Sequence, residues 1–269
     1  MKKFAAMMVS VAVAMALSPA AAFAAPATLG ADSTTNQSGS TQVSAQAGKQ
    51  VTMYLVSKAG DYSISYENGL ATVINSPSAT HTFGYEGKYV TSYKNTQGWH
   101  ENSGYFTYGK KGRLAEVVSG GSQGVMTYKE TYNYDKAGRV SKVLHDRTGD
   151  VATYSFKYNS KKRMSKKSLK ASNGSVYTTA YSYDGKGNLT KVRESYSTKS
   201  CKNAYKKGRL SKRVVTESYS SWSSTKTISY KYKAVKVPKS YVSQIKKQQW
   251  ALLNQPASVG VLPVNPLYF

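Results

Sequence analysis

Tyr181-Ser182-Tyr183-Asp184-Gly185-Lys186-Gly187-Asn188-Leu189-Thr190-Lys191-Val192 is the stretch that decides the fold. Its two tyrosines are two positions apart, as a half-buried strand requires, and Asp184 to Gly187 have the chemistry of a tight turn. Leu189 and Val192 then begin an apolar return strand. The stretch therefore predicts a β-hairpin.

The hairpin pattern recurs along the chain about every 24 residues, which indicates an internal repeat. The second aromatic residue of each copy serves as an anchor, and the anchors are Tyr66, Tyr85, Tyr108, Tyr134, Tyr158, Tyr183, Tyr205 and Tyr232. The residue two positions before the anchor is large and apolar or aromatic in every copy except one, which has Asn203.

Each copy supplies two strands and two turns. Gly112, Gly138 and Gly187 follow their anchors by four residues and suit a left-handed turn position, whereas the Tyr158 copy has Lys162 there and should form a looser turn. We expect an all-β fold in which tandem β-hairpin repeats form an up-and-down antiparallel meander, a curved or rolled single sheet of roughly fourteen to sixteen strands.

The apolar residues after each turn do not follow a simple strand pattern. Leu189 and Val192 are three positions apart, as are Val140 and Val143, so a regular strand would place them on opposite faces. Either a bulge shifts the phase, or both faces of the sheet bury side chains.

Two copies, Tyr134-Asp135-x-x-Gly138-Arg139-Val140 and Tyr183-Asp184-x-x-Gly187-Asn188-Leu189, resemble the YD repeats of Rhs-type bacterial surface proteins. The resemblance covers roughly residues 62–236, with partial matches elsewhere in that range. It implies β-hairpins that wind into a continuous sheet outside the cytoplasm, often as a shell around a C-terminal toxin.

The rest of the chain divides by composition. Residues 1–24 are predicted to be a Sec-type signal peptide and residues 25–50 a flexible linker. Residues 51–237 form the repeat domain, and residues 238–269 form a C-terminal helix and an extended tail. The helix should run from Tyr241 to Leu253 with Ser240 as its N-cap, and it should cover the sheet.

The formal net charge of +25 favours polyanionic partners such as acidic envelope polymers, lipid head groups or nucleic acid, although no specific nucleic acid is predicted. Lysines that keep exposed strands soluble would produce the same charge. Cys201 has no second cysteine to pair with, so an internal disulfide and cysteine-based metal sites are excluded.

Little in the sequence points to catalysis. His81, His100 and His145 are far apart, and the acids next to His100 and His145 should point to the opposite strand face. A hydrolase would need one of these two histidines to meet carboxylates in a cleft. We predict no catalytic residue, no metal site and no cofactor, and we expect the protein not to be an enzyme.

Aromatic rings interleaved with cations can bind polymers, because rings stack on sugars or bases while cations hold anionic groups. The candidate polymer-binding residues are Trp99, Trp222, Lys161, Lys162, Arg163, Lys166, Lys167, Lys206, Lys207, Arg209, Lys212 and Arg213.

These features predict a secreted or cell-surface, non-catalytic binding or structural module that contacts anionic envelope polymers or glycans. One alternative is an accessory or remnant of a YD-repeat toxin-type system, with a polypeptide partner that the sheet encloses or presents. Another is an outer-membrane β-barrel. The cationic strands and the prolines at 263 and 266, which would spoil a closing strand, lead us to expect that the protein is not an integral membrane protein.

Overall fold

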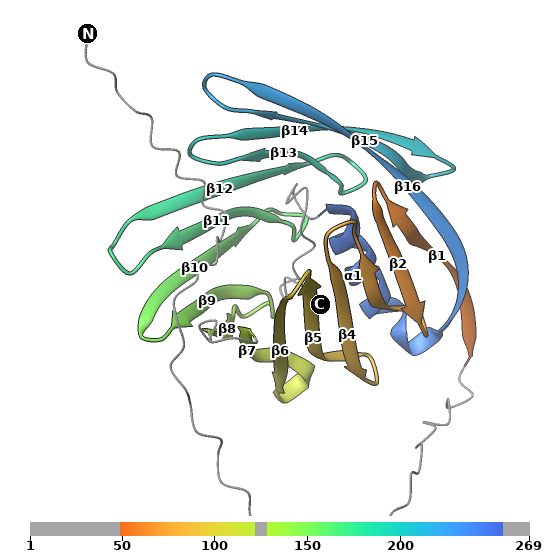
Figure 1. Cartoon of the computed structure of the whole chain (residues 1–269), viewed down its shortest axis with the longest axis horizontal. Coiled ribbons are helices and arrows are strands. Elements are labelled where there is room, and N and C mark those ends of the chain that lie inside the picture. The colour runs from red at the N-terminus through yellow and green to blue at the C-terminus, as the bar shows by residue number, and fades with distance from the viewer. Residues whose placement is uncertain (1–48, 122–127, 255–269) are drawn as a thin grey trace, which may run out of the picture.

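The computed structural model of the protein describes residues 49–121 and 128–254, in which sixteen antiparallel strands close into one barrel (Figure 1). The strands are β1 (Gln50–Ala59), β2 (Tyr62–Glu67), β3 (Leu70–Asn75), β4 (Thr80–Glu86), β5 (Tyr89–Gln97), β6 (His100–Gly109), β7 (Arg113–Gly121), β8 (Tyr128–Tyr134), β9 (Val140–Arg147), β10 (Asp150–Tyr158), β11 (Met164–Lys170), β12 (Val176–Tyr183), β13 (Leu189–Arg193), β14 (Thr198–Lys206), β15 (Arg209–Ser218) and β16 (Ser223–Pro238). Each strand pairs with its sequence neighbour.

The prediction of an open meander sheet is wrong, because the first strand pairs with the last. β1 and β16 are paired from Gln50↔Pro238 to Ala59↔Tyr230. The opposite edge of β1 meets β2 only at Lys58↔Ser63 and Ala59↔Tyr62, so closure depends mainly on the β1–β16 pairing. Closure follows from twist and tilt accumulated over all the strands, which no single hairpin reveals. The antiparallel hairpins and the all-β character are confirmed.

A β-bulge follows the turn in every complete hairpin and explains the three-residue spacing. In β8–β9, Asn133 pairs with Lys142 and Tyr134 pairs with Val140, so Ser141 has no partner. The same shift occurs before the other anchors, and the bulged residues are Thr72, Thr91, Ala115, Ser165, Thr190 and Ser211. The first of the two alternatives is therefore correct: the phase of the return strand shifts.

The anchor tyrosines link each hairpin to the one before it. The Tyr134 hydroxyl donates to the Leu114 carbonyl, and the Tyr158 hydroxyl donates to the Val140 carbonyl, both at 2.7 Å. Tyr66, Tyr85, Tyr183 and Tyr232 make the equivalent bond at 2.6 to 2.8 Å. Each acceptor residue flanks a bulge, where the ladder is interrupted, so the next copy supplies the missing partner.

The core follows the inner face of the barrel. Six of the eight residues two positions before the anchors are buried there, including Phe83, Phe106 and Phe156, and most of the anchor rings pack against this cluster. The alternate positions point outward and are polar in many places, with exposed lysines such as Lys157 and Lys166 paired across β10 and β11.

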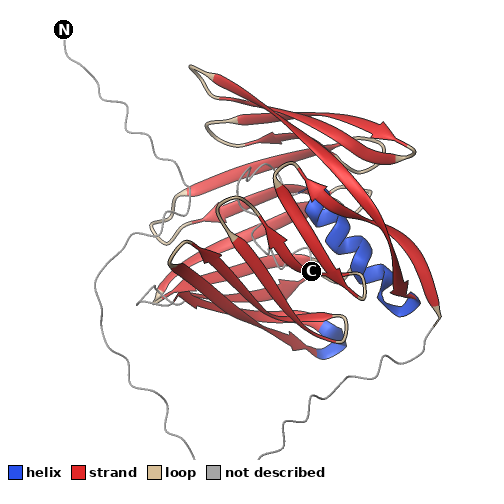
Figure 2. Ribbon diagram, turned by 45° about the vertical axis from the view of Figure 1, so that its right-hand side comes forward, coloured by secondary structure: helices blue, strands red, loops and turns tan. Residues whose placement is uncertain are grey.

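The predicted C-terminal helix is present as α1 (Val242–Asn254), and it crosses one end of the barrel (Figure 2). Ser240 lies within a 3₁₀ turn, Lys239–Tyr241, that leads into α1, so it is not the N-cap. Near the seam where β1 and β16 close the barrel, Gln249 accepts a bond from the Val56 N–H and Gln248 accepts one from the Ala71 N–H. Within the described residues, no helix has the length and apolar character needed to cross a membrane.

Closure also overturns the prediction that the protein is not an integral membrane protein. That prediction relied partly on prolines 263 and 266, but the barrel closes through β16, which ends at Pro238. A closed barrel is one of the architectures that can span a bilayer. The predicted signal peptide, most of the linker and the extended tail lie outside the described residues.

Candidate functional site

The two ends of the barrel are built from two different sets of turns. Every turn that leads from an even-numbered strand to the next odd-numbered strand lies at one end, and the remaining turns lie at the other. The first set follows the anchor tyrosines, so we call that end the anchor end and the opposite end the rim. The rim turns β9–β10, β11–β12, β13–β14 and β15–β16 lie along the left of Figure 1.

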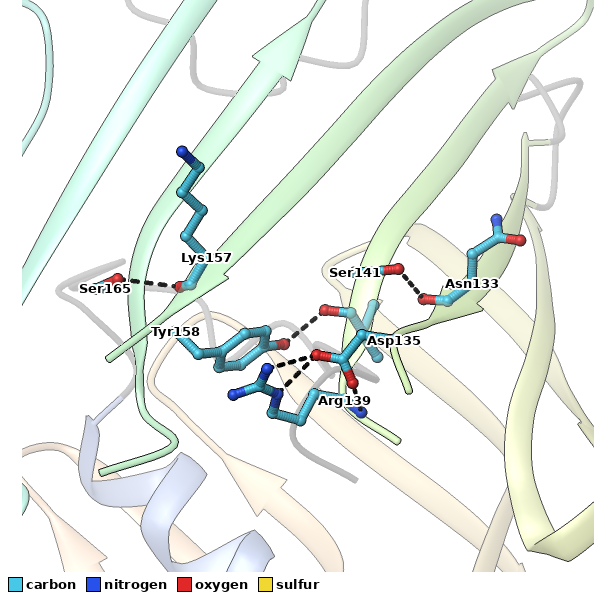
Figure 3. Close-up of polar contacts among 8 residues, drawn as sticks. Asn133, Asp135, Arg139, Ser141, Lys157, Tyr158 and Ser165 are labelled. Atoms are coloured by element: carbon cyan, nitrogen blue, oxygen red, sulfur yellow. Dashed lines mark hydrogen bonds and ion pairs between the residues drawn. The ribbon is translucent and has the colours of Figure 1, made fainter. Parts of the chain in front are cut away.

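The turn after Tyr134 shows how the anchor end is built (Figure 3). The Asp135 N–H donates to the Arg139 carbonyl at 2.8 Å, and the Gly138 N–H donates back to the Asp135 carbonyl at 2.9 Å. The Asp135 carboxylate accepts bonds from the backbone N–H and the side chain of Arg139 at 2.9 and 2.7 Å. These bonds, led by that of the Arg139 backbone, lower the pKa of Asp135. The carboxylate has the turn-forming role that the sequence predicts.

The turn after Tyr158 is not looser, although it has Lys162 in place of glycine. The Lys162 N–H donates to the Asn159 carbonyl at 2.9 Å, and the Arg163 N–H donates to the Asn159 side chain at 3.0 Å. Lys162 adopts the same left-handed conformation, with φ of 60°. The hydrogen bonds are kept at the cost of a conformation that a lysine adopts rarely.

Arginines at these turns pack along the barrel wall. The guanidinium of Arg113 lies over the Tyr134 ring at 5.5 Å, and that of Arg139 lies over the Tyr158 ring at 4.7 Å. Arg163 repeats the arrangement on Tyr183 at 5.9 Å. Cation–π contacts therefore hold the arginines against the next hairpin, while the lysines of the same turns extend into solvent.

The exposed lysines of the anchor end form a continuous set, which we call the cationic end. It comprises Lys88, Lys110, Lys111, Lys136, Lys161, Lys162, Lys186, Lys206 and Lys207, together with Lys246 and Lys247 of α1. Asp135 and Asp184 lie in turns of this end, where hydrogen bonds within their own turns engage both. The exposed Glu67 and Glu86 end β2 and β4 beside two further turns of the same end. The cationic end therefore presents an excess of mobile positive charge.

The rim has the opposite character. None of its described turns between strands carries lysine or arginine, and two of them carry Asp61 and Glu194. Most of the exposed large hydrophobic residues lie in or beside the rim turns, namely Trp99, Val151, Val176, Tyr177, Tyr196, Tyr219 and Trp222. Lysines are therefore more numerous in the turns of the anchor end than in the described turns of the rim, although Arg147, Lys170 and Arg193 end strands beside rim turns.

The structure brings together half of the predicted polymer-binding residues. Lys161, Lys162, Arg163, Lys206, Lys207 and Arg209 lie in or beside two turns of the anchor end. Sequence reasoning missed the matching lysines of the other anchor turns, such as Lys110 and Lys136. Each of these lysines follows an anchor tyrosine within four residues, and this proximity was the signal that could have identified them.

The other predicted residues are scattered. Trp99 and Trp222 lie at the rim, where Trp99 stacks on His100 at 3.6 Å and Trp222 stacks on Tyr219 at 4.3 Å. Lys166 and Lys212 are exposed on outward strand positions, whereas Lys167 pairs with Phe156 on the inner face. Burial lowers the pKa of Lys167. These residues do not belong to one surface with the cationic end.

Arg213 is buried and has a structural role. Its side chain donates to Asn203 in β14 at 2.8 Å, to Asn254 at 3.1 Å and to the Leu253 carbonyl. Asn203 in turn donates to the Asp184 carboxylate at 2.9 Å. Burial alone would raise the pKa of Asp184, but the bonds from Tyr205, Asn188 and Asn203 lower it. Asn203, which is polar where the other copies have a large apolar or aromatic residue, therefore lies where α1 docks.

The histidines behave differently from one another. Glu101, next to His100, pairs with Lys94. Asp146, next to His145, accepts a bond from the Gly149 N–H. Glu130 on the neighbouring strand reaches His145, with Oε1 and Nδ1 3.3 Å apart. His81 is buried on the inner face, and burial lowers its pKa. Within the described residues, no three His, Cys, Asp or Glu side chains converge as metal ligands would.

Cys201 lies half-buried in β14. Lys199 and Lys202 are close to it in the sequence, and cations beside a thiol can lower its pKa. Burial instead raises the pKa of the thiol, although Arg213 and Lys199 act in the opposite direction. The thiol is therefore not activated as a nucleophile.

No protein-family model and no curated protein matches the chain. Among solved structures, it is similar to a porin-like protein from Bacteroides uniformis ATCC 8492, with 14% identity over 67% of this chain and 96% of that chain and a TM-score of 0.37. A TM-score this low does not establish a common fold. The resemblance of the hairpins to YD repeats stays a prediction.

Proposed function

We propose that the protein is an exported, non-catalytic β-barrel module that binds anionic polymers of the cell envelope through its cationic end. The observation that carries this proposal is the concentration of exposed lysines in the turns at one end of the barrel. The anchor turns and α1 present exposed lysines side by side, whereas the described rim turns between strands contain none.

A rigid array of lysines suits a polymer with regularly spaced negative charges. The barrel fixes where each turn begins, because bulges, tyrosine bonds and arginine stacking hold the turns in place. The lysine side chains stay flexible and can adapt to different phosphate or carboxylate spacings. Many weak contacts acting together give useful affinity, and added salt screens them.

The test compares two variants of equal charge. One replaces Lys110, Lys136, Lys161 and Lys206 of the cationic end by glutamine. Its matched control replaces the outward strand residues Lys142, Lys157, Lys166 and Lys212 by glutamine. With heparin and purified teichoic acid as probes, we expect the first variant to bind about tenfold more weakly and the control to change about twofold or less.

Two results would count against the proposal. Equal losses in both variants would mean that binding depends on net charge alone. Wild-type binding that does not weaken between low and high salt would mean that the contacts are not ionic.

An outer-membrane β-barrel is the second candidate, and closure with an even number of strands is the observation that favours it. Embedding would have to accommodate outward lysines such as Lys157 and Lys202, each of which costs about 2–4 kcal/mol at the bilayer midplane. Fractionation tests membrane embedding, which polymer binding at the cationic end does not exclude. A membrane barrel needs detergent for extraction, whereas recovery in the soluble fraction without detergent would eliminate it.

A further inference from the structure

A connected row of polar and aromatic side chains crosses the inner face from β5 to β10. Tyr93, Gly104, Ser119 and Tyr128 are aligned on consecutive strands. Gly104 has no side chain, and an added Cβ would lie 2.3 Å from Cε1 of the Tyr93 ring. The Tyr93 ring therefore passes over β6, and its hydroxyl meets Ser119 and Tyr128.

The next row contains an oriented carboxylate–imidazole pair. Glu130, His145 and Ala152 are aligned on β8, β9 and β10. One carboxylate oxygen of Glu130 meets His145 Nδ1 at 3.3 Å, and the other accepts a bond from the Tyr132 hydroxyl. The His145 ring lies 4.9 Å from that of Tyr128. Both oxygens of Glu130 are thus engaged, which fixes the orientation of the pair.

This arrangement leaves His145 one free hydrogen-bonding position. A carboxylate only accepts hydrogen bonds, so the proton of the neutral imidazole lies on Nδ1 and Nε2 becomes an acceptor. Among the described residues, Nε2 has no hydrogen-bond partner. The side chains of His145 and Glu130 are 25% and 21% exposed although they point inward, so solvent reaches this part of the inner face.

We propose that these residues form a binding site for a neutral glycan segment on the inner face of the barrel, separate from the cationic end. The Tyr128 ring offers an apolar face to a sugar ring, and His145 and the tyrosine hydroxyls offer both donors and acceptors to its hydroxyl groups. With a neutral imidazole, the Glu130 carboxylate and the ammonium of Lys167, which lies 5.7 Å from the centre of the Tyr154 ring, carry opposite charges, so the site has no excess charge that would select an ionic ligand.

The test uses the full chain and a neutral probe, chitohexaose, to which the cationic end contributes no ionic attraction. The protein is labelled with ¹⁵N-histidine, because the chain's three histidines report on three places. His81 is buried, His100 stacks on Trp99 at the rim, and His145 lies in the proposed site. We expect the ring signals of His145 to shift saturably with added probe, while those of His81 and His100 stay unchanged.

The variants His145→Ala and Glu130→Gln should each weaken binding at least about tenfold. Glu130→Gln can still accept the Tyr132 bond, so it keeps the barrel folded if the alanine variant does not. Lys142→Ala, on the outer side of β9, is the matched control and should leave binding unchanged. The proposal is overturned if no signal shifts up to about 10 mM probe, or if His100 alone shifts, which would place the ligand at the rim.

Discussion

At the scale of single residues, an anchor tyrosine both packs in the core and bonds one hairpin to another. Its ring packs on the inner face, and its hydroxyl bonds the preceding hairpin at a carbonyl that flanks a bulge. An unpaired buried carbonyl costs about 1–3 kcal/mol. The anchor positions therefore carry tyrosine because only a long ring with a terminal hydroxyl can make this bond to the carbonyl of the preceding hairpin.

Tyr158→Phe removes one of these hydroxyls and leaves the Val140 carbonyl unbonded. We expect a loss of about 1–3 kcal/mol of stability, measured as a lower midpoint of urea unfolding. Tyr105→Phe is the control, because Tyr105 is exposed on the outer face and should leave the midpoint unchanged.

Lys162→Gly should stabilise the protein by about 0.5–1 kcal/mol, since glycine adopts the left-handed conformation without a steric penalty. The turn keeps its hydrogen bonds, which come from the backbone and Asn159. Lys161→Gly is the control, because Lys161 is not in that conformation, and it should not raise the midpoint. A fall in stability for Lys162→Gly would show that the lysine side chain itself holds the turn.

At the scale of elements, α1 is held at its middle and at its C-terminal end by polar groups. Gln248 and Gln249 bond backbone N–H groups beside the seam, and Asn254 accepts the Leu189 N–H in β13 at 2.8 Å. The helix therefore ties the β1–β3 side to the β13–β15 side across the anchor end. Docking relies on side-chain amides because bulges and turns leave these backbone groups unpaired.

Arg213→Met should release the C-terminal part of α1, because it removes the bonds to Asn203, Asn254 and the Leu253 carbonyl. We expect a loss of about 2–4 kcal/mol and faster amide hydrogen exchange in α1 than in the strands. Lys212→Met changes the exposed neighbour on the same strand and serves as control. Unchanged exchange in α1 would show that the helix docks without Arg213.

At the scale of the whole molecule, hairpins, turns and the terminal helix could be predicted because each depends on residues close in sequence. Closure could not, since the tilt of the strands is a property of all of them together. The pairing of Glu130 with His145 needed the strand register, which the bulge at Ser141 sets. A visible signal of that bulge was the Ser, Thr or Ala that directly follows the apolar residue paired with each anchor tyrosine.

The burial of many tyrosines also predicts that the folded protein loses stability at alkaline pH. Burial raises the pKa of Tyr158 and Tyr232 to about 12, above the ordinary value of 10.0. The folded state favours the protonated phenols. Their contribution to the free energy of unfolding is therefore fully present below about pH 10 and is lost as the pH rises towards 12. Urea midpoints at pH 8, 10, 11 and 12 should show this decline, and a constant midpoint to pH 12 would contradict it.

The most direct test of the closed barrel is a disulfide between its first and last strands. Thr52 and Lys236 are exposed Cα partners across the β1–β16 pair, whereas an open sheet would place them at opposite edges. With Cys201→Ala removing the native thiol, the pair Thr52→Cys and Lys236→Cys should form an intramolecular disulfide under mild oxidation. The pair Thr52→Cys and Lys157→Cys should not. A folded monomer in which the first pair stays reduced would contradict closure.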